Sequence, residues 1–132
     1  MRTMDPRERL GLPLRVTTNV ADSSSVMFLR PSVTRCALRL ENVGDCRVAY
    51  KVKVTDNRLF SVERPYGCLE RGGVRSVTVS FVGTGMLEEG MHRVSIHTLP
   101  APERAAAAAV WAEHQGPPSG YATLPIIFHR PV

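Results

Sequence analysis

The sequence predicts an all-β fold, a seven-stranded immunoglobulin-like β-sandwich with one short helical crossover. Three observations support this prediction. Apolar and polar residues alternate with a period of two along several segments, which is typical of half-buried strands. Gly, Asn and Asp gather between these segments and indicate turns. One Ala-rich segment near the C-terminus interrupts the alternation and favours a helix.

Each predicted strand presents one apolar face. The clearest case is residues 48–55, VAYKVKVT, in which Lys51 and Lys53 alternate with apolar side chains. An edge strand is expected over Leu14–Thr18, and further strands over Val26–Arg30, residues 36–42, residues 74–82, residues 93–99 and Leu124–Phe128. The apolar faces of two sheets built from these strands would pack together as the core.

The remaining segments complete one domain. Turn sequences such as NVGD at 42–45 and RPYG at 64–67 separate the strands. A short helix is expected over Glu103–His114, with Trp111 packed against the sandwich edge, and the alternative is an unfolded Ala/Pro loop. Residues 1–11 are expected to be a flexible N-terminal segment, and residues 12–132 the domain.

The charge distribution indicates an acidic partner. The net charge is +5, and residues 30–80 hold ten Lys/Arg but five Asp/Glu, so the excess lies in the centre of the chain. A basic segment attracts an acidic peptide, a nucleic acid or a lipid headgroup. No apolar run approaches the ~20 residues that span a bilayer, and the N-terminus lacks the apolar centre of a secretory signal. A cytoplasmic or nuclear location is expected, and we favour the cytoplasm.

Several classes of chemistry lack a signal in the sequence. Three cysteines without a CxxC pair argue against a disulfide framework or a zinc site, and free thiols are expected. No nucleophile, metalloprotease or nucleotide motif is present, so an enzyme, a cofactor and a metal are not expected. His92 and His97 should face opposite sides of a strand as surface histidines. No aromatic residue flanks the lysines on their outward face, which argues against nucleic-acid binding.

The order of these features resembles the major sperm protein (MSP) domain family, which includes the VAP receptors of the endoplasmic reticulum. The resemblance covers residues 12–131. It rests on residues 38–82, which begin LRLENVGD and include VAYKVKVTDN and VERPYGCLERGGV, then on RVSIHTLPAP at 93–102, AVWAEH at 109–114 and LPIIFHRP at 124–131. The family implies an immunoglobulin-like sandwich and no catalysis, in agreement with the strand pattern.

The resemblance implies two alternative functions. VAP-like domains bind FFAT motifs, which are acidic peptides with two phenylalanines, whereas nematode sperm proteins assemble into dimers and filaments. A third possibility is a cytoskeletal or ciliary scaffold built from similar modules. The chain ends at Val132, just beyond the domain, so the coiled coil and membrane anchor of VAP proteins are not expected. The expected partner is an acidic FFAT-like peptide, with homo-oligomers as a further possibility and without nucleic acid or membrane insertion.

The resemblance also indicates a peptide-binding site. The basic strand of VAP-like domains corresponds to residues 51–55, so Lys51, Lys53 and Thr55 are expected to face the ligand, and a second family lysine corresponds to Arg93. Three positions depart from the family pattern. Val54 replaces a threonine, Ser95 replaces a methionine of the phenylalanine pocket, and Thr123 replaces a basic residue. Ser95 and Thr123 complete the candidate site.

Overall fold

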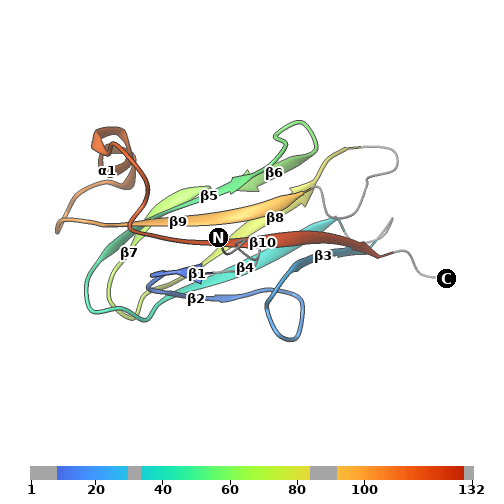
Figure 1. Ribbon diagram of the computed structural model, residues 1–132, viewed down its shortest axis with the longest axis horizontal. Helices are drawn as coiled ribbons and strands as arrows, with labels where there is room; N and C mark the ends of the chain where they lie inside the picture. Colours follow the sequence, from blue (N-terminus) through green and yellow to red (C-terminus); the bar gives the residue numbers. More distant parts are fainter. Residues whose placement is uncertain (1–8, 30–33, 84–91, 130–132) are drawn as a thin grey trace, which may run out of the picture.

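The computed structural model describes residues 9–29, 34–83 and 92–129 (Figure 1). Its strands and helix are β1 (Arg9–Leu10), β2 (Leu14–Thr17), β3 (Val26–Leu29), β4 (Arg35–Asn42), β5 (Val48–Val54), β6 (Phe60–Glu63), β7 (Tyr66–Leu69), β8 (Val74–Phe81), β9 (Arg93–Pro100), α1 (Ala107–Glu113) and β10 (Gly120–His129).

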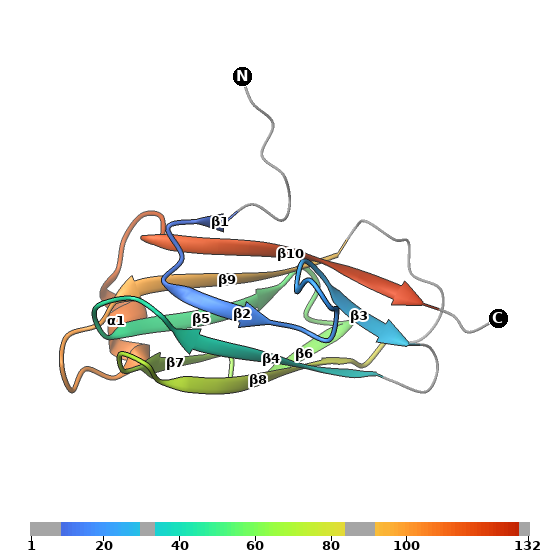
Figure 2. The ribbon, with the colours of Figure 1, turned by 90° about the horizontal axis from the view of Figure 1, so that it is seen from below.

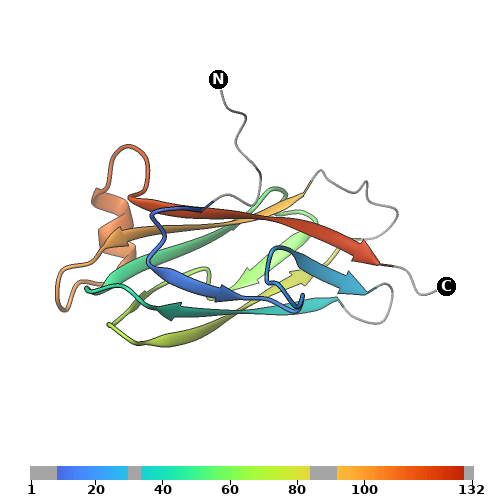
Figure 3. The ribbon, with the colours of Figure 1, turned by 60° about the horizontal axis from the view of Figure 1, so that its bottom comes forward.

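These strands form two facing sheets, which confirms the predicted sandwich. The β5 sheet has the order β1-β10-β9-β5-β7, and β3 also pairs with β10, in parallel. The β4 sheet has the order β2-β4-β8-β6, and all of its pairs are antiparallel. Figure 3 shows the two layers, with red β10 and orange β9 above blue β2 and teal β4. The α1 helix lies at one end, against β5 and β7 (Figure 2).

In the residues that the structure describes, all seven predicted strands are present, together with three short strands that were not predicted. β6 and β7 lie in or beside segments interpreted as turns, and each has only four residues, too few for a clear alternation. β1 lies inside the N-terminal segment expected to be flexible, and it pairs with Tyr121 and Ala122 of β10. These strands are stabilised by pairing with longer neighbours, which their own sequences do not reveal.

The predicted helix is present but shorter than expected. It begins at Ala107 rather than Glu103, because Arg104 has a φ of 67° and so lies in the left-handed region, outside the helical range. Trp111 packs against the sandwich, as predicted, with Ala49 of β5 and Cys68 of β7 in the same cluster.

The core lies between the sheets and is richest in aromatic residues at the end away from α1. The chain has four phenylalanines, Phe28, Phe60, Phe81 and Phe128, and their ring centroids lie 5.4–6.5 Å apart. Nearer the middle, Leu38, Leu40, Ile96 and Leu124 are almost wholly buried. Such packing fixes each strand's register, because a shift by one residue would expose its apolar face.

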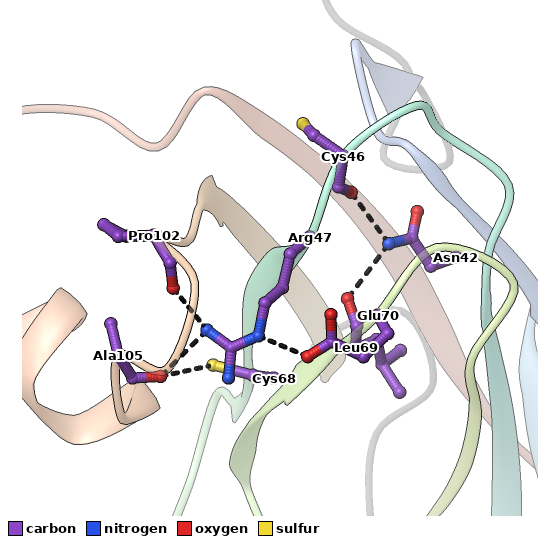
Figure 4. A network of polar contacts seen from close by, with 8 residues as sticks. All are labelled: Asn42, Cys46, Arg47, Cys68, Leu69, Glu70, Pro102 and Ala105. Carbon is purple, nitrogen blue, oxygen red and sulfur yellow. Dashed lines mark hydrogen bonds and ion pairs between the residues drawn. The ribbon is translucent and has the colours of Figure 1, made fainter.

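Arg47 attaches the crossover segment to the sandwich (Figure 4). One terminal nitrogen, Nη1, donates to the Pro102 carbonyl at 2.7 Å and to the Ala105 carbonyl at 2.9 Å, and Nε donates to Glu70. The Cys68 thiol donates to the same Ala105 carbonyl at 3.6 Å. The sequence groups Arg47 with the basic residues available to a partner, but its side chain is only 17% exposed and is used within the fold.

Arg47→Ala is expected to lower the free energy of unfolding by about 2 kcal/mol, because two backbone carbonyls lose a charged donor. Glu70→Ala is the matched control. The Glu70 side chain is 73% exposed, so its ion pair is worth about 0–1 kcal/mol. Urea denaturation of both variants measures the difference. Equal losses would contradict the role assigned to the carbonyl bonds.

The Tyr50 hydroxyl is a polar group inside the apolar core. Within the described residues it is buried and has no hydrogen-bond partner. Gly67 leaves room for it, since a Cβ at Gly67 would lie 2.8 Å from the hydroxyl oxygen. A buried hydroxyl that has lost water without gaining a partner reduces stability.

Tyr50→Phe is therefore expected to keep stability or raise it by up to about 1 kcal/mol, because the ring still fills its site and the unpaired hydroxyl is gone. Thermal denaturation gives the result as a Tm equal to or above that of the wild type. A clear drop in Tm would show that the hydroxyl is hydrogen-bonded in solution.

Candidate peptide-binding face

Strand β5 separates buried and outward-facing side chains along its length. Tyr50 and Val52 are buried, whereas Lys53 is exposed and Lys51 is half-buried on the opposite side. Thr55 follows the strand and is exposed. The alternation seen in the sequence is therefore the actual orientation of this strand, and it places both lysines on the outer surface of the β5 sheet.

Strand pairing brings the six expected site residues together. Lys53 pairs with Ser95 of β9, and Ser95 pairs with Thr123 of β10. Thr55 lies beside Arg93: the Thr55 amide donates to the Arg93 carbonyl, and the Arg93 amide donates to the Thr55 hydroxyl, both at 3.2 Å. Residues 28 to 42 positions apart in the chain thus lie side by side in adjacent strands.

Two further residues belong to this surface and were not assigned to it from the sequence. Lys51 pairs with His97, and His97 pairs with Tyr121. The rings of His97 and Tyr121 stack with centroids 6.3 Å apart. The parity of residues 93–99 already placed His97 on the same side as Ser95. We call the surface formed by Lys51, Lys53, Thr55, Arg93, Ser95, His97, Tyr121 and Thr123 the basic face.

The prediction of surface histidines is only partly correct. His97 is half-buried between neighbouring strands, and its Nε2 lies 3.2 Å from the Ser95 hydroxyl. His92 is also half-buried: its ring packs edge-on against Phe60 at 5.3 Å, and its Nδ1 lies 3.2 Å from the Thr55 hydroxyl. The cross-strand neighbours that cover these rings are distant in sequence, so periodicity could not reveal them.

Four arginines outside the basic face are paired with acids, but the two lysines are not. Arg15 and Arg39 share Glu41, Arg58 pairs with Asp56, and Arg47 pairs with Glu70. In the part of the chain that the structure describes, neither Lys51 nor Lys53 forms an ion pair. The basic face therefore carries positive charge that is available to a ligand.

The region around Ser95 is polar. Lys53 and Thr123 lie on either side of Ser95, and its hydroxyl contacts His97. Val54 points away from this face and packs against the core. The cross-strand row of Lys53, Ser95 and Thr123 includes Ser95, which corresponds to a position of the family's phenylalanine pocket. This row offers hydrogen-bonding groups and charge, whereas a phenylalanine requires apolar walls.

Neither a metal centre nor a membrane span is indicated. The three cysteines are free. Over residues 9–29, 34–83 and 92–129, no three His, Cys, Asp or Glu side chains gather as metal ligands would. In the same residues, no helix has the length and hydropathy needed to cross a bilayer.

The pKa of His97 depends on the charge of the basic face. Burial lowers the pKa of His97 below its ordinary value of about 6.5, and the charges of Lys53 and Lys51 lower it further. Because the pKa of His97 is lower in the folded state, a falling pH protonates His97 in the unfolded chain before it does so in the folded protein. His97 thus contributes stability above pH 6.5, and this contribution is lost as the pH falls towards the lower folded pKa.

The pKa of His97, followed by NMR titration, is expected to rise in Lys53→Ala, because one repelling charge is removed. Arg35→Ala, which removes a cation from the β4 sheet, should leave it unchanged. The wild type should also lose Tm more steeply below pH 6.5 than His97→Gln does. An unchanged pKa in Lys53→Ala would contradict the electrostatic coupling.

Comparison with known proteins agrees with the observed fold. The family model described as MSP (Major sperm protein) domain matches residues 19–116. No curated protein matches the chain. Among solved structures, SSP-19, an MSP-domain protein of Caenorhabditis elegans, is similar with a TM-score of 0.68 and 21% identity, over 83% of this chain and 95% of that one.

Two other solved structures show how far the similarity extends. WR4, a C. elegans MSP family member, has a TM-score of 0.68 and 19% identity over 89% of this chain and 98% of that one. The YadV chaperone has a TM-score of 0.63 and 10% identity over 92% of this chain and 53% of that one. At these identities the structures support the fold alone, whereas the family model spans most of the domain. The chain belongs to the MSP (major sperm protein) domain family.

Proposed function

We propose that this domain is a protein-interaction module that binds acidic, FFAT-like peptide segments through the basic face, and that it is not an enzyme. One observation carries the proposal: Lys51 and Lys53, which have no ion pair within the described residues, lie in register with β9 on an open sheet surface beside Arg93. Complementary charge of this kind steers an acidic ligand to the surface.

The edge of β5 supports binding of an extended peptide. β7 pairs with β5 only across Val48–Lys51, and the Val52 amide then donates to Pro65. On that side no described strand pairs with Lys53 or Val54, whereas β9 pairs with both on the other side. Backbone groups of successive strand residues point to opposite sides, so on this side it is the Val54 amide and carbonyl that could hydrogen-bond to a peptide added as a strand. Alternate side chains of the peptide would then reach the basic face.

The charges alone would give modest affinity. An exposed ion pair contributes about 0.2–1 kcal/mol, so the lysines and Arg93 would set the rate and specificity of encounter more than its final strength. A buried phenylalanine side chain contributes about 1.5–3 kcal/mol. Both parts of an acidic, phenylalanine-containing peptide are therefore needed for a useful affinity.

The alternative function is self-assembly of the sperm-protein type, in which exposed strand edges would pair with another copy of the chain rather than with a peptide. A cytoplasmic location suits both functions. Sedimentation over a concentration series separates them, because a peptide-binding module remains monomeric at concentrations at which an assembling protein forms dimers or filaments.

Reversing two charges of the basic face should abolish most of the binding. Lys53→Asp combined with Arg93→Asp is expected to weaken binding of a fluorescein-labelled acidic peptide with two phenylalanines about tenfold or more at low salt, since two attractions become repulsions. Fluorescence polarisation measures the affinity. Binding by the wild type should weaken as salt is added.

The matched control is Arg35→Asp combined with Arg71→Asp, which makes the same change in net charge at two exposed sites away from the basic face. This control should bind like the wild type. Absence of binding to the wild type at low salt, or equal weakening in both double variants, would refute the proposal.

A further inference from the structure

A hollow of about 270 Å³ opens at the end of the basic face that adjoins the helix. It is lined by Lys51 of β5, Tyr66 of β7, and Ala108, Trp111 and Ala112 of α1. Its volume is below the range of about 300–1,000 Å³ that is usual for small-molecule pockets. The hollow is therefore of a size for one side chain of a partner rather than for a cofactor.

The hollow exists because α1 presents alanines there. Ala108 and Ala112 are four residues apart, so they lie on one side of the helix, and both are exposed. The rigid wall is Trp111, whose Nε1 donates to the Tyr50 carbonyl at 3.2 Å. Tyr66 forms another wall and is 49% exposed, although most large apolar residues are buried. Tyr and Trp in such positions are typical of interaction hot spots.

Lys51 connects the hollow to the basic face. Its Nζ lies 5.9 Å from the centroid of the Trp111 ring, so a cation stands at the rim. Lys53 follows two residues later on the same face, about 6.6 Å along the strand. Alternate side chains of an extended peptide have the same spacing, so an apolar side chain in the hollow would bring the next side chains on that side to Lys51 and Lys53.

We propose that the hollow receives an aromatic side chain of the acidic peptide, with carboxylates of the peptide following along Lys51 and Lys53. This inference rests on the proposed function and specifies where the peptide is anchored. The polar row at Ser95 offers no comparable apolar walls. A larger hollow of about 520 Å³ lies on another side of α1, but its lining includes Glu113 and neither Lys nor Arg, which disfavours an acidic ligand there.

Filling the hollow tests this anchor. Ala112→Leu places a larger side chain in it, and Ala109→Leu, which lines the other hollow, is the matched control. Both change an exposed alanine of α1 to a good helix former, so both should fold. The probes are a synthetic acidic peptide with two phenylalanines and the same peptide with both replaced by alanine.

The wild type and Ala109→Leu should bind the phenylalanine peptide about tenfold or more tightly than the alanine peptide. Ala112→Leu should bind the phenylalanine peptide about tenfold more weakly than the wild type and should barely distinguish the two peptides. Trp111 is the only tryptophan, so with peptides lacking Trp and Tyr its fluorescence reports directly on the hollow. The phenylalanine peptide should change this emission at saturation.

The outcomes separate this inference from the proposed function. Wild-type binding that depends on Lys53 and Arg93 but is the same in Ala112→Leu, without a change in Trp111 emission, would overturn the anchor and leave the proposed function standing. Equal weakening in Ala112→Leu and Ala109→Leu would also overturn the anchor. Absence of any binding to the wild type at low salt would overturn both.

Discussion

The pairing register between β5 and β9 is the constraint on which the candidate site depends. Tyr50, Val52, Val94 and Ile96 must enter the core, so the intervening side chains of both strands must face outward. The register then places Lys51 beside His97 and Lys53 beside Ser95. A slip by one residue would bury the lysines and expose the apolar side chains, which makes it energetically prohibitive. The positions of the charges are thus determined by the same packing that stabilises the fold.

The crossover segment limits the other end of this surface. Arg47 holds Pro102 and Ala105, and the Trp111 indole is hydrogen-bonded to Tyr50, so α1 is attached to the strand that carries the lysines. The helix covers Ala49, and the centroid of its Trp111 ring lies 5.9 Å from Lys51 Nζ. It therefore adds an aromatic wall to one end of the basic face. One surface that is both positively charged and partly apolar thus results from three kinds of interaction. These are strand pairing, the hydrogen bonds from Arg47 to backbone carbonyls, and the indole hydrogen bond of Trp111.

Much of this could be predicted from the sequence, because it depends on local periodicity. Alternation in residues 48–55 correctly orients Lys51, Lys53 and Tyr50, and the Ala-rich segment correctly indicates a helix with Trp111 at the sandwich. What could not be predicted depends on contacts between distant segments. β6 and β7 form by pairing with longer strands, Arg47 is engaged by a loop 55 residues away, and the hollow at Tyr66 and Trp111 requires β7 and α1 to meet. The resemblance to the MSP family supplied the grouping of the site residues, and the strand register explains it physically.

The most direct test of the central claim, that an acidic peptide binds the surface created by the β5–β9 register, is chemical-shift mapping by NMR. Titration of the labelled protein with an acidic peptide containing two phenylalanines should shift the amides of residues 49–55, 93–97 and 121–123 together with the Trp111 indole. The amide signals of β2, β4 and β8 in the opposite sheet should not shift. Shifts concentrated on the β4 sheet, or their absence at a peptide concentration that saturates binding, would contradict the account.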